Sequence, residues 1–395
     1  MCNPTLKELL GIVRLIDLLL DGLLPSGLQL GANAPIPSDP SSQLALKFWM
    51  NSHQTKGHSA SDFPVLDLKA LVPIEPNAST DPASQLLFYS AVAYRSLSTA
   101  FILTQRSAAL RRIESSKNPN TASWLKHYAQ PDHWITVGIS HLTTSRQHAS
   151  VPAVQATEVN SEISNLTNPS SSMHLRTWKL SGIVPWVTAS TYSDAIVAGA
   201  CDSKNHQLQY LFLVPTNTPK MVRGPGMDLL ALSDSCTDEV HLNDVVVTEG
   251  NLLHGPVENV MAASQTAGAG GLQTSALALG LAARATDWIQ EQSLQRPSLE
   301  IHATHLNERW THLIHELMKI ARNEPTSMHA NSLREESNRL VLRATQAAMA
   351  IGKGAGFLTS NPVSQWAKEA MFFLVWSCPQ GIADAHLCEW TDFDR

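Results

Sequence analysis

The middle of the chain has a residue pattern that differs from the pattern on both sides of it. From Trp134 onwards, short segments rich in β-branched residues alternate with turn residues. Examples are AIVAGAC, QLQYLFLVP and DEVHLNDVVV, the first two of which flank the turn cluster Asp202–Asn205. Such segments are typical of antiparallel strands, and several of them predict a β-barrel or β-sandwich. Residues 175–190 predict two further strands that separate at Ser181 and Gly182.

Helical periodicity dominates on both sides of this region. Residues from Ser84 to Ile113 place apolar side chains on more than one face, as a buried helix does. Beyond Gly255, four segments have helical periodicity, the last of them starting at Pro362, and four such helices predict a bundle. The sequence therefore predicts an α+β multidomain protein. Its parts are an N-terminal helical domain (residues 1–129), a middle β domain (residues 130–254) and a C-terminal four-helix bundle (residues 255–395).

Composition excludes several classes of protein. The chain has 395 residues, of which 43% are hydrophobic and 16% charged, as expected for a globular protein with a sizeable core. Its net charge is -6 and its Lys and Arg residues are scattered, which argues against nucleic acid as a partner. No uncharged stretch approaches the ~20 residues of a membrane span. Charges from Lys7 to Asp21 recur at helical spacing, so the apolar start predicts an amphipathic helix. Five scattered cysteines without a CxxC pair predict a reducing, cytoplasmic location.

The stretch from Ile351 to Pro379, IGKGAGFLTSNPVSQWAKEAMFFLVWSCP, is the most specific motif of the chain. It resembles the closing segment of the acyl-CoA dehydrogenase family. There, a Gly-rich helix junction ending in Gly-Phe leads to an Arg-Asp-Ala helix and then to Tyr-Glu-Gly-Thr, whose Glu removes the substrate proton. The resemblance aligns Gly354 and Gly356 with the Gly-rich junction. It aligns Trp376 with the Tyr and Ser377 with the catalytic Glu.

The middle region carries further resemblances to the same family. The segment GIVPWVT, residues 182–188, is similar to a Gly-x-x-x-Trp-Ile-Thr segment whose Trp and Thr lie against the flavin. Trp134-Ile135-Thr136 resembles a short strand that precedes the flavin-binding loop, and Ser235-x-Thr237 resembles a Ser-x-Thr that follows. The resemblance implies an FAD cofactor with Thr136, Trp186 and Thr188 at the flavin. Without these neighbouring matches, a tryptophan such as Trp186 is more often part of a core.

Two glycines and one arginine are the candidate residues for binding the diphosphate of the cofactor. The resemblance implies that Gly354 and Gly356 meet the FAD diphosphate, since glycine lets the backbone approach a phosphate closely. The family's diphosphate-binding Arg-x-x-Phe-Gly is replaced by QEQSLQRPS, in which Arg296 is the possible substitute. In a dinucleotide-binding fingerprint the glycines follow a strand. Here they follow a helical pattern, so they do not form that motif.

The same resemblance implies an oxidoreductase that acts on a CH–CH group of a small molecule, with an acyl thioester as the candidate substrate, and that forms a homodimer or homotetramer. The catalytic base is unassigned, because the Ser377 hydroxyl is no base near neutral pH without an activating partner. The family's second acid position falls within Gly268–Gly271, which has no acid, and Gln273 and Thr274 are the nearest polar residues. Two alternatives follow: a reduced-flavin-dependent monooxygenase of the same fold, or a catalytically silent member with a binding role.

A metal site is the remaining alternative. His302, His305, His312 and Glu316 share one quadrant of a predicted helix. However, His305 and His312 would be about 10 Å apart along the axis at ~1.5 Å per residue, too far for one ion. We therefore predict no metal.

Overall fold

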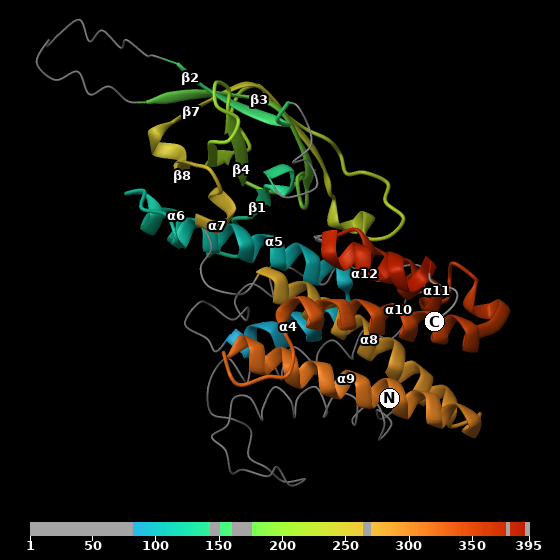
Figure 1. The fold of residues 1–395 in the computed structure, drawn as a ribbon. Coiled ribbons are helices and arrows are strands. Elements are labelled where there is room, and N and C mark those ends of the chain that lie inside the picture. Colours follow the sequence, from blue (N-terminus) through green and yellow to red (C-terminus); the bar gives the residue numbers. More distant parts are fainter. Residues whose placement is uncertain (1–81, 143–150, 160–175, 264–269, 377–379, 392–395) are drawn as a thin grey trace, which may run out of the picture. The chain divides into compact units, whose positions relative to one another are not determined.

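The computed structural model describes residues 82–142, 151–159, 176–263, 270–376 and 380–391 (Figure 1). The chain divides into two compact units. Residues 102–267 form one unit, here called the β unit, and residues 1–101 with 268–395 form the other, here called the helical unit. The predicted boundaries at residues 129 and 254 stay a prediction, and the two units are described separately.

The β unit contains one mixed sheet whose strands follow the order β6-β7-β3-β2-β4-β5-β8, with β1 paired to β4. Its strands are β1 (Ile135–Gly138), β2 (Val154–Val159), β3 (Thr177–Val187), β4 (Ala195–Asp202), β5 (Gln209–Pro215), β6 (Met221–Arg223), β7 (Asp238–Thr248) and β8 (Leu252–Val257). β1 and β2 run parallel to β4, whereas the other pairings are antiparallel. The alternating segments of the sequence thus form strands, as predicted.

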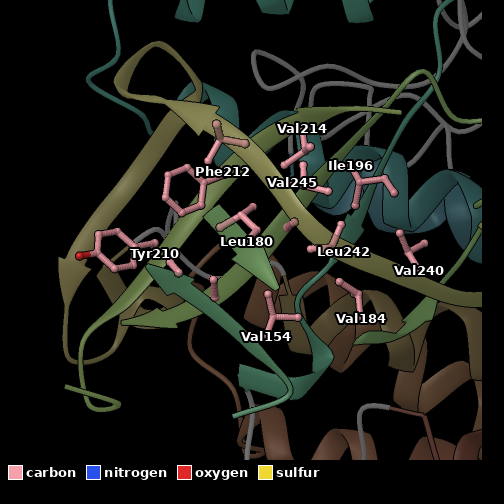
Figure 2. Close-up of a cluster of buried hydrophobic side chains, with 14 of the residues drawn as sticks. Val154, Leu180, Val184, Ile196, Tyr210, Phe212, Val214, Val240, Leu242 and Val245 are labelled. Carbon is pink, nitrogen blue, oxygen red and sulfur yellow. The ribbon is translucent and has the colours of Figure 1, made fainter. Parts of the chain in front are cut away.

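One face of this sheet encloses an apolar core. Figure 2 shows side chains from several strands pointing towards one another, among them Val154, Leu180, Ile196, Phe212 and Val245. They come from β2, β3, β4, β5 and β7, because alternate residues of a strand point to the same face. Trp178 is completely buried in this core, with its ring 5.4 Å from that of Phe212.

The opposite face of the sheet is covered by helices. α5 (Leu97–Glu114) contributes Ala109 and Ile113, and α6 (Thr121–Tyr128) contributes Tyr128, to a second cluster that includes Val197 and Leu211. β4 and β5 are therefore buried on both faces, which explains their nearly unbroken apolar sequences.

The two strands expected within residues 175–190 are one strand, β3. Its register with β7 shifts between Leu180 and Ser181, which is a β-bulge or irregularity. Gly182 follows with φ 135°, and an added Cβ there would lie 2.0 Å from the Ala153 carbonyl oxygen. Glycine therefore lets the strand continue through a bend, where the sequence pattern indicated a turn.

The helical unit is built around α8. Its described helices are α4 (Pro82–Arg95), α8 (Gly270–Ser293), α9 (Glu300–Ala321), α10 (Ala330–Gly356), α11 (Pro362–Met371) and α12 (Gln380–Thr391), together with the first turn of α5. α8 packs against α4, α9 and α10, and α10 also packs against α11. The order of helices, β region and helical bundle is confirmed. The single helix predicted from Ser84 to Ile113 is interrupted at Ser96, between α4 and α5.

Gly280 determines how closely α4 and α8 approach. A Cβ at this position would lie 2.2 Å from the carbonyl oxygen of Ser90 and 2.9 Å from the Cβ of Ala93. Only a residue without a side chain fits there.

Within the described residues, no helix is sufficiently long and apolar to cross a bilayer.

Candidate functional site

Three hydroxyl groups form a chain of hydrogen bonds where β3 ends and β7 begins. Ser235 and Thr237 lie 2.7 Å apart between their hydroxyl oxygens, and the Thr237 hydroxyl donates to that of Thr188 over 3.2 Å. All three residues are buried. Since Thr237 donates to Thr188, its oxygen accepts from Ser235, and the hydrogen of the Thr188 hydroxyl is left for another acceptor. We call Thr188, Ser235 and Thr237 the hydroxyl cluster.

Thr136 on β1 has a buried hydroxyl that lacks a partner. Its side chain is fully buried, and its Oγ1 forms no hydrogen bond among the described residues. Gly138, two residues on and so on the same face of β1, would bring a Cβ to 2.6 Å from Val184 and 3.3 Å from Val187. That face of β1 is directed at the part of β3 that leads to Thr188. An unpaired buried hydroxyl is costly, and a polar ligand would satisfy it.

Trp186 lies on the exposed side of β3. It is 53% exposed, in contrast to the completely buried Trp178. An indole ring with this exposure offers a flat apolar surface to a ligand or a partner. The structure thus brings the predicted Trp186 and Thr188 to one end of β3.

The backbone around the hydroxyl cluster is strained and firmly held. Ala189, Leu232 and Cys236 have φ values of 60°, 66° and 47°, in the left-handed region that non-glycine residues seldom occupy. The amide of Ala189 donates to the Ser235 carbonyl over 2.9 Å, which joins the two segments. Strained residues of this kind often cluster at ligand sites.

Two charged residues fix the loops beside the cluster, and sequence reasoning missed both. Arg223 donates to the carbonyls of Ser190 and Ser193 over 2.6 and 3.1 Å. The buried Asp238 accepts from the amides of Gly226 and Glu239, each over 2.7 Å. In the sequence Asp238 is only the first residue of the strand-like segment DEVHLNDVVV, so no local signal distinguished it.

In the helical unit, the predicted Gly-rich junction is a break within α10. Lys353 has φ 52° and ψ -144°, whereas the residues on both sides are helical. A Cβ added at Gly354 would meet no atom within 4 Å, so packing does not require glycine there. A Cβ at Gly356 would lie 3.2 Å from the Met349 carbonyl oxygen, a tight contact. Both predicted glycines therefore lie at this break, in the other compact unit from Thr136, Trp186 and Thr188.

Arg296 also lies at the break in α10. Its Nη1 donates to the carbonyl oxygen of Ile351 over 3.1 Å, and its Nη2 to Gln292 over 3.3 Å. A cation near the last carbonyls of a helix is favourable. The residue that the sequence suggested as a diphosphate ligand is thus adjacent to the glycines suggested for the same role.

Ser377, which the sequence resemblance aligns with a catalytic Glu, lies outside the described residues, but Trp376 before it packs in an aromatic cluster. Its ring stacks on Phe372 at 5.1 Å and meets Phe101 edge-on at 4.9 Å. Its carbonyl accepts a hydrogen bond of 2.8 Å from the buried Arg334. The end of this segment is therefore fixed by an aromatic cluster and a cation.

Several polar groups are buried inside the helical unit. Burial, followed by the nearby Asp287 carboxylate, raises the pKa of Tyr94 to about 12, and the Tyr94 hydroxyl donates to Asp287 over 3.0 Å. Gln273 and Thr274 are buried on α8, and the Nε2 of Gln273 has no partner among the described residues. The Gln273 amide is available to a ligand in chemical terms, but no carboxylate accompanies it in the first turn of α8.

The histidines of α9 do not assemble a metal centre with Glu316. His302, His305 and His312 are exposed, whereas Glu316 is buried and accepts from Lys319, Thr326 and Ser327. In the part of the chain that the structure describes, no three His, Cys, Asp or Glu side chains are grouped to hold a metal ion. Glu316 instead anchors the connection from α9 to α10.

Glu316 should make stability depend on pH. The hydroxyl of Thr326, and then Lys319, lower the pKa of Glu316 to about 2 from an ordinary 4.5. A lowered folded-state pKa gives stability that is present above pH 4.5 and lost as the pH falls towards 2. We expect Glu316→Gln to cost on the order of 1–3 kcal/mol near neutral pH, a difference that vanishes on acidification. Urea unfolding at several pH values measures it.

The control for this measurement is Glu308→Gln, on the exposed side of the same helix. A loss of stability at Glu316→Gln that stays constant between pH 7 and pH 3 would contradict the assignment.

The chain is similar to known proteins both in sequence and in structure, whereas no family model matches the sequence. The short-chain specific acyl-CoA dehydrogenase of rat mitochondria is 26% identical over 209 residues, which are 49% of this chain and 51% of that protein. The chain thus matches about half the length of this curated relative.

The fold likeness extends over nearly the whole chain. The structure of butyryl-CoA dehydrogenase from Megasphaera elsdenii matches with a TM-score of 0.65 and 17% identity, covering 98% of this chain and 100% of that one. Dibenzothiophene monooxygenase from Paenibacillus matches with a TM-score of 0.61 and 11% identity, covering 96% and 97%. The architecture is therefore the acyl-CoA dehydrogenase fold. The sequence likeness to acyl-CoA dehydrogenases covers about half of the chain.

Proposed function

We propose that the chain binds FAD and is an oxidoreductase acting on a carbon–carbon bond of a small molecule, with an acyl thioester as the first candidate. The observation that carries the proposal is the hydroxyl of Thr136, which is fully buried and has no hydrogen-bond partner among the described residues. It lies on the face of β1 directed at the strand of Thr188. The relatives, which are acyl-CoA dehydrogenases, suggest the substrate class.

Bound FAD would supply the hydride acceptor that no protein side chain can provide. The residues of the β unit would hold and orient the ring. Thr188 presents a hydroxyl hydrogen to a ring acceptor, Thr136 adds a second polar group, and Trp186 covers an apolar face. In the helical unit, the open backbone at Gly354 would receive a phosphate group.

The missing acid favours a second candidate within the same fold. A serine at position 377 cannot remove a proton near neutral pH unless another group activates it. A monooxygenase that uses reduced flavin needs no such base, and one fold neighbour is a monooxygenase by name. A silent member that binds a ligand without turnover is the third candidate.

The visible absorption spectrum of the purified protein tests the proposal directly. We expect bands of oxidised flavin, either as purified or after reconstitution with FAD, and one FAD released per chain. A protein that stays colourless after reconstitution would refute flavin binding. Anaerobic mixing with acyl-CoAs of several chain lengths then separates the candidates, because only a dehydrogenase should lose its flavin colour.

Thr136→Val should affect stability and cofactor affinity in opposite directions. Valine matches the shape of threonine but removes the unpaired hydroxyl, so we expect the apoprotein to gain about 1 kcal/mol. If the hydroxyl binds the ring, FAD affinity should fall about tenfold. Urea unfolding of the apoprotein and fluorescence titration with FAD measure the two effects.

The matched control for Thr136→Val is Ser90→Ala in α4. Ser90 also has a buried hydroxyl without a partner among the described residues. Its removal should leave FAD affinity unchanged. Equal FAD affinities of wild type and Thr136→Val would remove Thr136 from the site.

We also propose a homodimer or homotetramer and a cytoplasmic location. Phe357 and Val375 near the ends of α10 and α11 are 83% and 75% exposed, which is unusual for large apolar side chains outside an interface. Cys201, Cys236 and Cys388 are free thiols, in keeping with a reducing compartment. A monomeric mass by light scattering would contradict the oligomer.

A further inference from the structure

Lys353 adopts a backbone conformation that normally requires glycine. Its φ of 52° and ψ of -144° interrupt α10, and this region of dihedral space is nearly closed to residues with a side chain. Glycines occupy the positions on both sides, Gly352 and Gly354, yet the break falls on the lysine between them. A strained residue persists only where the surrounding structure or a function requires it.

The surroundings of the break are open and cationic. A Cβ at Gly354 would meet no atom within 4 Å, and one at Gly352 would touch only Trp288, at 3.9 Å. The Lys353 side chain is exposed, and Arg296 holds the carbonyl of Ile351 two residues earlier. In the described part of the chain, neither Lys353 nor Arg296 forms an ion pair with a carboxylate. Two cations that pair with no carboxylate of the described residues thus lie beside open backbone.

The helix dipole alone does not explain this arrangement. A cation at the end of a helix is favourable, but a lysine with ordinary helical dihedrals could provide the same charge without strain. Exposed backbone beside unpaired cations is suited to an anion with several oxygen atoms, such as a diphosphate.

We infer that Lys353 is a binding residue for the diphosphate of FAD, held by its strained backbone with its ammonium group beside the bare glycines. The inference rests on the proposed function and adds to it a charged side chain at the diphosphate. It assigns to the lysine an electrostatic contribution that Gly354 and Gly356 cannot make.

Two substitutions separate the charge of Lys353 from its strain. Lys353→Gly removes both, so the apoprotein should melt about 2–4 °C higher while its affinity for FAD falls three- to tenfold at low salt. Lys353→Met removes only the charge, so affinity should fall equally without a rise in Tm. In both variants the dependence of affinity on salt should weaken, because one phosphate contact is lost. Binding of riboflavin, which has no phosphate, should not change.

Lys220→Gly is the matched control. Lys220 is also an exposed lysine with positive φ, 70°, but it lies in the β unit before β6. Its replacement should raise Tm without altering FAD affinity. If the wild type binds FAD and both Lys353 variants bind it equally tightly at every salt concentration, the inference is overturned and the proposed function stands. If the wild type binds no FAD, both are overturned.

Discussion

Gly280→Ala is expected to destabilise the helical unit by about 3 kcal/mol or more, through a single added methyl group. The new Cβ would lie 2.2 Å from the carbonyl oxygen of Ser90 and 2.9 Å from Ala93. The Ser90 carbonyl belongs to the backbone of α4 and cannot rotate away, so α4 and α8 must separate. Loss of soluble protein, or a midpoint in urea well below that of the wild type, is the expected result.

Gly381→Ala in α12 is the control for Gly280→Ala. It makes the same change in a helix, but no atom lies within 4 Å of the added Cβ. Because alanine favours the helix over glycine by about 1 kcal/mol, this variant should be as stable as the wild type or slightly more stable. Equal stability of Gly280→Ala and Gly381→Ala would mean that α4 and α8 do not approach each other as described.

Trp178→Ala is expected to destabilise the β unit by about 3–5 kcal/mol, because it leaves a cavity in the core of the sheet. The ring of Trp178 is fully buried and contacts those of Tyr210 and Phe212, with centroids 5.9 and 5.4 Å away. Neither neighbouring ring can fill the space without leaving its own contacts. Urea unfolding of the full chain, monitored by circular dichroism, measures the loss.

Trp186→Ala in the same strand provides the contrast. Trp186 is 53% exposed, so its removal should cost less than about 1 kcal/mol. It should nevertheless reduce the quenching of FAD fluorescence on binding if the indole ring covers the flavin. A large loss of stability at Trp186→Ala with little at Trp178→Ala would reverse the roles assigned to the two tryptophans.

Residue patterns within a short stretch of sequence correctly predicted the start of α11 and the strand β7. Pro362 is the first residue of α11, as predicted, because proline suits the first helical turn. Asn361 before it accepts a hydrogen bond from the amide of Val363 and caps the helix. The alternating pattern of DEVHLNDVVV likewise gave β7.

Predictions failed where the tertiary structure overrode a local signal. Ser181 and Gly182 indicate a turn, but pairing of β3 with β7 on one side and β2 on the other keeps the strand continuous. The interruption between α4 and α5 at Ser96 has no neighbouring proline or glycine from which it could be predicted. Neither feature can be derived from residue type alone, since both depend on distant neighbours.

The candidate site was predicted only as a set of separate residues. The hydrogen bond from Thr237 to Thr188 joins residues that are 49 positions apart, and no spacing rule predicts it. The unpaired state of Thr136 and the strain at Lys353 are properties of geometry alone. The resemblance supplied the residue types, whereas the direction of the donors in the hydroxyl cluster required coordinates.

The helical unit is assembled from two segments that the ribosome makes at different times. Tyr94 in α4 and its partner Asp287 in α8 are 193 residues apart, and the whole β unit is synthesised between them. At about 5–20 residues per second, α4 must wait roughly 10–40 s for the helix that covers it. Most of its residues, including Leu86, Leu87 and Phe88, are apolar and end up buried. The contacts that α4 makes with α8 are therefore denied to a nascent chain until α8 has been made, and its apolar side chains need protection from aggregation until then.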